Sequence, residues 1–150
     1  MKKLINRAFI YAMLGLAAGV FYREFTKWNG FTGRTALAFM HPHLLVMGAL
    51  LCLILALFTR HLPLLEDKRF GSFLRLHDIA LPAMTLMLGV RGVMQVLKTD
   101  LSPGLDAAVS GLAGLTHILL GLALVFVFIA LRKVVGTLSD VPQGNMAKGN

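Results

Sequence analysis

Three side chains that could do chemistry stand inside long apolar runs of this 150-residue chain: His43, Arg91 and His117. Imidazole nitrogen is a common ligand for transition metals, and guanidinium pairs with carboxylates. In lipid such groups are costly unless they meet a partner, so they mark candidate functional positions. Two imidazoles on separate helices indicate axial ligation of one metal ion, and a nearby arginine suits a cofactor carboxylate such as a haem propionate.

Other side chains are secondary candidates for a metal site. His41 stands two residues before His43, with Pro42 between them, and Met47 follows one helical turn later. His41 and His43 lie about 200° apart on a regular helix, so both cannot face one ligand. Pro42 is expected to push His41 out of α conformation, so that the helix kinks or starts there. His77 stands apart, and methionine with imidazole would suit copper as Cu(I).

The composition places these residues in a membrane. Hydrophobic residues make up 57% of the chain and charged residues 15%, which is far more apolar than a soluble domain. The apolar runs lack strand alternation, and lipid admits only helices or closed barrels. We predict an all-α, four-helix transmembrane bundle over residues 1–137, followed by a polar flexible tail, 138–150. Its expected spans are 4–23, 36–59, 73–97 and 107–131.

The basic residues predict the orientation. Ten Lys and Arg residues fall on the side of the termini and only four on the other side, so the positive-inside rule places both termini in the cytoplasm. The net charge of +8 is thereby explained by topology, and no nucleic-acid partner is expected. A cleaved signal peptide is the alternative for the N-terminus. The GxxxG pair Gly15 and Gly19 favours a retained, closely packed helix.

With this topology His43, Arg91 and His117 lie about 12, 10 and 16 Å below the outer surface, at about 1.5 Å per residue. Gly114 and Gly121 share the helix face of His117, because they stand three residues before it and four after it. A strip without side chains suits a porphyrin ring, and close helix packing explains the glycines equally well. No acid is expected at the depth of Arg91, which leaves a propionate as its predicted partner.

Three stretches, GLAAGVFYREFTKWNGFTG, VRGVMQVLKTDLSPGL and SGLAGLTHILLG, resemble a family of small bacterial four-helix integral membrane proteins of unknown function. The resemblance covers about residues 2–135. It implies a multi-pass protein of the bacterial cytoplasmic (inner) membrane and supplies no activity. The helix with His43 followed by Gly48 also resembles the haem-bearing helices of the haem-copper oxidase superfamily, although the chain has too few histidines for the copper site of an oxidase.

These observations lead to one hypothesis and one alternative. The hypothesis is a small b-type haem protein, with haem b between His43 and His117 and Arg91 at a propionate. It would serve electron transfer, with a quinone or another redox partner, or haem or gas sensing. The alternative is a cofactor-free or copper-handling membrane protein, or a subunit of a larger complex; a homodimer is compatible with both. No catalytic residues are predicted, and the acids Asp78 and Glu24 are expected to be ion-paired.

Overall fold

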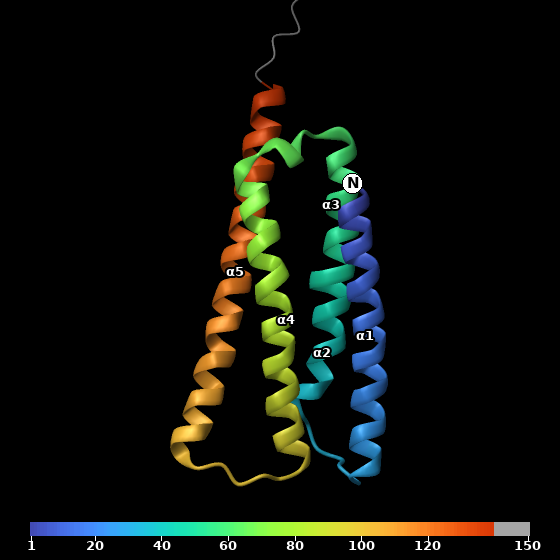
Figure 1. The fold of residues 1–150 in the computed structure, drawn as a ribbon, viewed down its shortest axis with the longest axis vertical. Helices are drawn as coiled ribbons and strands as arrows, with labels where there is room; N and C mark the ends of the chain where they lie inside the picture. The colour runs from blue at the N-terminus through green and yellow to red at the C-terminus, as the bar shows by residue number, and fades with distance from the viewer. Residues whose placement is uncertain (140–150) are drawn as a thin grey trace, which may run out of the picture.

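The computed structural model describes residues 1–139, which form four long helical rods joined by short loops (Figure 1). Each rod is long and apolar enough to cross a membrane, so the predicted all-α, four-helix transmembrane bundle is confirmed. The first, third and fourth rods are single α-helices: α1 (Lys2–Trp28), α4 (Lys68–Val96) and α5 (Pro103–Ser139). The second rod, Ala36–His61, is composite: η1 (Ala36–Phe39), α2 (Met40–Pro42), η2 (His43–Leu50) and α3 (Leu51–His61). A short turn, η3 (Leu64–Glu66), precedes α4.

Three of the four helical rods extend well beyond the predicted spans. α4 begins five residues early, because the side chain of Asp67 caps it by accepting a hydrogen bond from the amide of Arg69 at 2.8 Å. α5 begins at Pro103, a residue suited to the first position of a helix because it has no amide hydrogen to leave unpaired. The predicted tail starts at 138, just before α5 ends, and its remaining residues, 140–150, lie outside the described part of the chain.

The second rod changes its helical pitch around Pro42. The rod begins after Thr35, whose hydroxyl accepts a hydrogen bond from the amide of Leu37 at 3.4 Å. After Pro42 the backbone follows a π-helix over η2, in which amides bond to carbonyls five residues back. The rod neither starts nor breaks at the proline. His41 is helical within α2, so the prediction that it leaves the α conformation was wrong.

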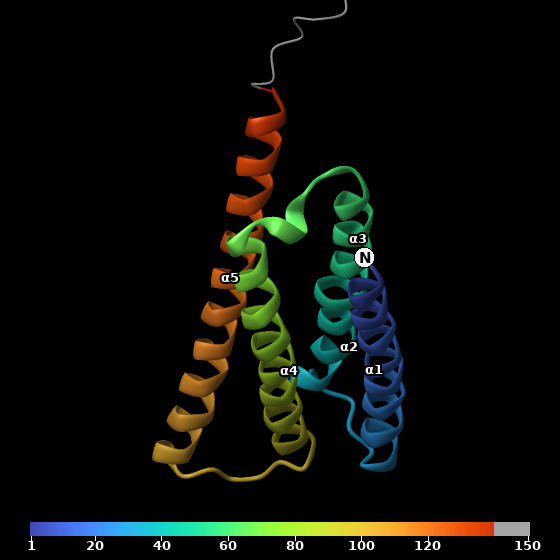
Figure 2. The same ribbon diagram turned by 45° about the horizontal axis from the view of Figure 1, so that its top comes forward.

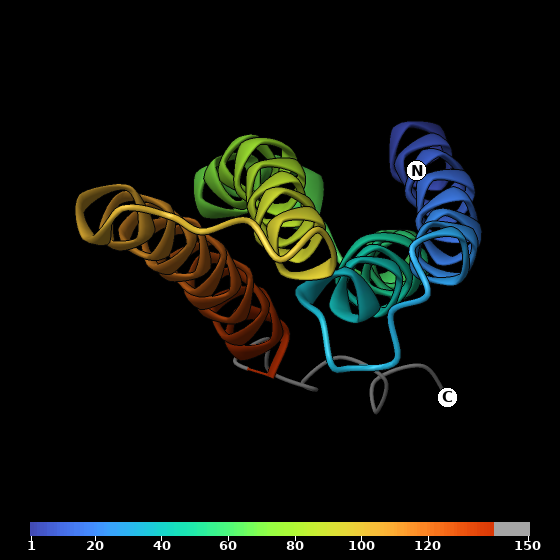
Figure 3. The ribbon, with the colours of Figure 1, turned by 90° about the horizontal axis from the view of Figure 1, so that it is seen from below.

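The four rods stand in an open arc. Seen along the bundle, the order is α1, the second rod, α4 and α5 (Figure 3). The N-terminus and the last turns of α5 lie at one end, here called the terminal end, and the loops 29–35 and 97–102 lie at the opposite, hairpin end (Figure 1). Toward the hairpin end α5 diverges from the second rod, as the tilted view also shows (Figure 2).

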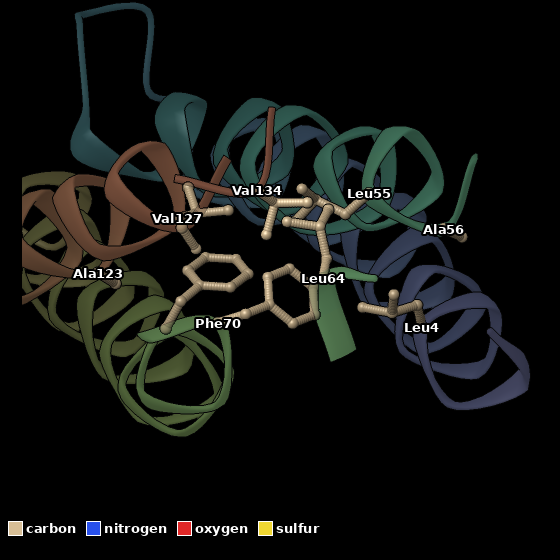
Figure 4. Packing of buried hydrophobic residues seen from close by; sticks show 10 residues of the cluster. Leu4, Leu55, Ala56, Leu64, Phe70, Ala123, Val127 and Val134 are labelled. Atoms are coloured by element: carbon tan, nitrogen blue, oxygen red, sulfur yellow. The ribbon is translucent and has the colours of Figure 1, made fainter. Parts of the chain in front are cut away.

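At the terminal end α5 is firmly packed. Phe70 and Phe73 of α4 are fully buried, and their rings lie among side chains from all four rods (Figure 4). Lys133 of α5 adds an ion pair, with its Nζ 3.0 Å from Oδ2 of Asp67. The other buried members of this cluster are Leu4, Leu55, Ala56, Leu64, Ala123, Val127, Ala130 and Val134. Van der Waals packing of this kind holds helices together in a membrane. Lipid tails are as apolar as the helix side chains, so the hydrophobic effect contributes little to helix association there.

Glycines let the first three rods approach closely. A Cβ on Gly15 would lie 2.8 Å from Cδ2 of Leu45, and one on Gly19 would lie 3.7 Å from His41. The predicted close packing of the GxxxG pair is therefore confirmed, with the second rod as its partner. On α4, a Cβ on Gly92 would overlap the backbone nitrogen of Leu37.

The acids inside or beside the spans are ion-paired, as expected. Arg7 of α1 donates from Nε and NH2 to the carboxylate of Asp78 on α4, at 3.0 and 2.7 Å. Glu24 pairs with Arg23. A charge within a span is costly without such a partner, so the Arg7–Asp78 pair joins α1 to α4.

Candidate haem site

His43 of η2 and His117 of α5 face each other. Their ring centroids lie 6.2 Å apart, and the ring planes are nearly perpendicular, at 87°. The two residues belong to different rods, and 74 positions separate them in the sequence, so this contact is a product of the fold. Both predicted ligands are thus brought together at one level of the bundle. They meet toward the hairpin end, where the backbones of the second rod and α5 separate.

Each imidazole of the pair is oriented by its own helix. Nδ1 of His43 lies 2.7 Å from the carbonyl oxygen of Phe39, and Nδ1 of His117 lies 2.8 Å from that of Ala113. A carbonyl oxygen only accepts hydrogen bonds, so each Nδ1 carries the hydrogen. The lone pair of a neutral ring is then on Nε2. Histidines that bind metals are oriented in this way, with the second nitrogen donating to a carbonyl.

The distance between the rings matches a shared metal ion. Two imidazoles bound through Nε2 on opposite sides of one ion have centroids about 6.3 Å apart, because each metal–nitrogen bond is about 2.0–2.1 Å and each nitrogen lies about 1.1 Å from its ring centre. Within residues 1–139 no group of three or more His, Cys, Asp or Glu side chains converges on a possible metal position. Among the described residues, the histidine pair thus has no third side chain of these types beside it.

An apolar cavity lies nearer the terminal end than the histidine pair, and neither histidine lines it. It has a volume of about 360 Å³ and lies between the second rod and α5. Its lining begins with Val46, three residues after His43, and with Leu124, seven residues after His117. Pockets for small molecules and cofactors have volumes of about 300–1,000 Å³ and mostly apolar walls. The remaining lining residues are Met47, Leu50, Leu51, Ile54, Leu55, Phe58, Val127, Phe128 and Leu131.

The glycines beside His117 face open space. A Cβ on Gly114 or on Gly121 would meet no atom of the described chain within 4 Å, and His117 itself is exposed. Close packing against another rod of this chain therefore does not explain these two glycines. Gly48 is different, because a Cβ there would lie 2.6 Å from Cγ of Tyr11. It serves packing against α1, and its spacing from His43 carries no sign of a ligand.

The secondary candidates lie away from the pair. His41 faces α1 beside Gly19, and its Nδ1 is buried without a hydrogen-bond partner. His77 is completely buried on α4, and its Nε2 lies 2.8 Å from the carbonyl oxygen of Met47. Met47 shares the lining of the apolar cavity. Neither His41 nor His77 makes a ring contact with His43 or His117.

Arg91 has a protein partner, which corrects the prediction that no acid of the protein would pair with it. Its NH1 is 2.5 Å from Oδ1 of Asp106 and 3.3 Å from Oγ of Ser110. Asp106 was placed outside the fourth span, but α5 begins at Pro103, so this carboxylate belongs to the first helical turn. The long arginine side chain reaches toward the hairpin end to meet it. Arg91 therefore needs no cofactor to neutralise its charge, although its remaining donors are not used by these two contacts.

Two features of the site were not foreseen in the sequence. The first is the π-helical form of η2, which has no residue signature beyond Pro42 at its start. The second is the bond from His77 to the backbone of η2. Each depends on how the rods approach one another, which residue spacing does not reveal.

Residues 1–134 match a family described as "Protein of unknown function (DUF2871)". The chain belongs to this family. No curated protein and no solved structure gave a match, and the resemblance of the His43 helix to haem-copper oxidases stays a prediction. Membership agrees with the resemblance noted in the sequence and assigns no activity, so the argument for function depends on the site.

Proposed function

We propose that this protein binds one haem b, with His43 and His117 as the two axial ligands of the iron. The observation that carries the proposal is the facing pair, with a centroid separation of 6.2 Å and with both Nδ1 atoms engaged by carbonyls. Haem also accounts for a site with two imidazoles and no third ligand among His, Cys, Asp and Glu, because the porphyrin supplies the four equatorial nitrogens. Bare copper would be left with two imidazoles, or three ligands if Met47 turned toward it.

The surroundings of the pair suit a porphyrin. The line between the two rings crosses from the second rod to α5. A porphyrin bound between the rings would lie perpendicular to this line and would therefore run along the bundle. The apolar cavity of about 360 Å³ lies farther along the bundle, beginning at Val46 and Leu124. On the α5 side, Gly114 and Gly121 leave the surface flat, and nothing in the described chain covers them. An apolar macrocycle gains contact with both walls there.

The hairpin end suits the haem propionates. Ser110 lies seven residues before His117, on the same face and about 10 Å along the helix. It contacts Arg91, so a propionate directed toward the hairpin end would meet a guanidinium and a hydroxyl. In this arrangement Arg91 divides its donors between Asp106 and the propionate. A polar cavity of about 450 Å³, lined in part by Arg91 and Asp106, lies at the hairpin end beside the loop between α4 and α5.

Electron transfer is the function that this ligation favours. Two histidines fill both axial positions of the iron, so no position remains for oxygen or another gas unless one histidine leaves. A six-coordinate haem in a lipid-facing site can exchange electrons with a membrane quinone or with a redox protein. Gas sensing would require displacement of His117, the more exposed ligand of the two.

An absorption spectrum tests the proposal. The protein, purified in detergent after growth with added haem, should show the sharp α and β bands of low-spin haem when reduced. His43→Ala and His117→Ala should each lose haem or become high-spin. His61→Ala is the matched control, because His61 is exposed at the end of α3. A colourless wild-type protein would refute haem binding, and elemental analysis of that protein for copper would test the alternative.

We further propose that the protein spans the bacterial cytoplasmic membrane with both termini in the cytoplasm. The ten-to-four distribution of basic residues supports this orientation. Single cysteines at Asn29 and Pro103 should react with an impermeant thiol reagent in intact cells, whereas one at Ser139 should not. The native Cys52 is completely buried and should give little background. The opposite labelling pattern would reverse the orientation.

A further inference from the structure

The π-helix η2 begins with a carbonyl that has lost its usual donor. The amide of His43 bonds to the carbonyl of Met40, three residues back. The carbonyl of Phe39, which that amide would meet in an α-helix, accepts the Nδ1–H of His43 instead, at 2.7 Å. The imidazole thus takes the place of an amide donor at the start of η2.

The end of η2 shows the same exchange with a side chain from another rod. The amide of Leu51 bonds to the carbonyls of Val46 and Gly48. In an α-helix this amide would bond to the carbonyl of Met47. Here that carbonyl accepts from His77 of α4, with Nε2 at 2.8 Å. A backbone carbonyl in the apolar interior strongly favours such a donor, so the π-helical register and the His77 bond support each other.

The surroundings of His77 are apolar apart from its bond to the carbonyl of Met47. Its exposed fraction is 0%, and its ring lies edge-on against Tyr11 and tilted against Phe73, with centroids 5.6 and 5.2 Å away. Its Nδ1 is buried and has no partner. Among the described residues, the carbonyl of Met47 is the only hydrogen-bond partner of this side chain.

We infer that His77 is a positioning residue: its bond to Met47 holds η2 in the π-helical register that directs His43 at His117. This inference rests on the proposed haem ligation. A shift of one residue in register rotates the start of the rod by about 100° relative to its end. Such a rotation turns the imidazole of His43 away from α5, so His77 acts on the iron through the backbone, without contact.

The test uses the full-length protein with His77 replaced in two ways. His77→Leu removes the donor. His77→Gln carries an amide nitrogen the same number of bonds from Cα as Nε2, so it can restore the bond to Met47. Electron paramagnetic resonance of the oxidised haem reports the angle between the two ligand planes. The wild type, with planes at 87°, should give a highly anisotropic low-spin signal.

We expect His77→Leu to lose haem or to replace that signal with a less anisotropic or high-spin one, and His77→Gln to retain it. Tyr11→Phe is the matched control: it keeps the ring contact with His77 and should leave the signal unchanged. A residue with only a packing role would lower the unfolding temperature without changing the signal. If His77→Leu yields no folded protein, His77→Asn, whose amide is too short to reach the carbonyl, replaces it.

A second measurement reads the register without haem. Val46 and Leu124 line the same cavity from the second rod and from α5. Cysteines at these two positions, in a Cys52→Ala background, should be cross-linked by a short bifunctional thiol reagent, and His77→Leu should slow the cross-linking. If the cross-linking rate depends on His77 but the protein binds no haem, the proposed function is refuted and the role of His77 in the register of η2 still stands. If His77→Leu binds haem with an unchanged electron paramagnetic resonance signal and an unchanged cross-linking rate, the inference about His77 is overturned and the proposed function still stands.

Discussion

Helical glycines in two regions of the described chain have opposite surroundings. Between α1, the second rod and α4, a Cβ on Gly15, Gly48 or Gly92 would lie within 3 Å of another rod. On α5, a Cβ on Gly114 or Gly121 would touch nothing in the described chain. In the first region glycine permits backbones to approach, and in the second it keeps a surface bare. The same residue type therefore allows close helix contact in the first region and leaves the helix surface bare in the second.

The largest effect is expected at Gly92. Gly92→Ala places a methyl group on the backbone nitrogen of Leu37, which cannot move without shifting the start of the second rod. We expect a loss of about 3 kcal/mol in unfolding free energy, the upper range for overpacking. Gly114→Ala is the control and should be neutral or stabilising by up to about 1 kcal/mol, because alanine favours helix more than glycine does. Equal unfolding temperatures in detergent for both variants would contradict the comparison.

The open surface of α5 should respond in the reverse way. Gly114→Leu should leave the unfolding temperature of the haem-free protein unchanged, since a Cβ there meets no atom within 4 Å. It should weaken haem binding about tenfold, which corresponds to a steric cost of about 1.4 kcal/mol. Haem titration measures the difference. Gly136→Leu, equally open but at the terminal end, should bind haem normally.

Substitutions of Arg91 test the hairpin end of the open surface of α5. In the proposed site Arg91→Leu should lower the midpoint potential by on the order of 70 mV, which is the effect of removing one positive charge at an assumed separation of about 10 Å and an effective dielectric constant of about 20. Arg91→Lys should give a midpoint potential between those of the wild type and Arg91→Leu, since it keeps the charge and loses the planar fork. Asp106→Asn should shift the potential upward. An unchanged potential in Arg91→Leu would leave its ion pair with Asp106 as its whole role.

The smallest effect concerns the fastening of α5 at the terminal end. The hydrogen bond from Lys133 and that from the amide of Arg69 lower the pKa of Asp67 below its ordinary value of 3.8. A lowered pKa means that the ionised carboxylate stabilises the fold above pH 3.8, and that this contribution is lost as the pH falls through the lower, folded-state pKa. Asp67→Asn should therefore unfold at a lower temperature than the wild type near pH 6, and the difference should vanish in strong acid. A difference independent of pH would show that the charge of the carboxylate does not contribute to the stability.

The sequence predicted the rods and the facing pair for physical reasons that act locally. Uninterrupted apolar length defines a span, and the rise per residue gives each polar group a depth, which was enough to place His43 and His117 at one level. The flat strip beside His117 followed from helical periodicity. The carboxylate that pairs with Arg91 was missed because the start of α5 was set at 107, where the charges end, while Pro103 starts the helix a turn earlier.

The parts that were not predicted depend on packing between rods. The spacing of Gly48 from His43 was interpreted as a resemblance to haem-bearing helices. In the structure, the ring of Tyr11 on α1 explains why a glycine stands at this position. The π-helix was not predicted, because its stability depends on a donor from α4 that no local pattern reveals. Residue spacing assumes a regular helix, and a change of pitch alters which residues share a face.

Under the proposed haem ligation, the one-sided attachment of α5 has a consequence for how haem enters the protein. Its terminal end is fixed by the Phe70 and Phe73 cluster and by Lys133, while its hairpin end stands apart from the second rod. A bundle of this form can complete its insertion into the membrane as an apoprotein, with its folding finished before any cofactor arrives. An amphiphilic haem dissolved in the bilayer could then enter sideways between the helices. Supply of haem and synthesis of the chain would not need to coincide in time.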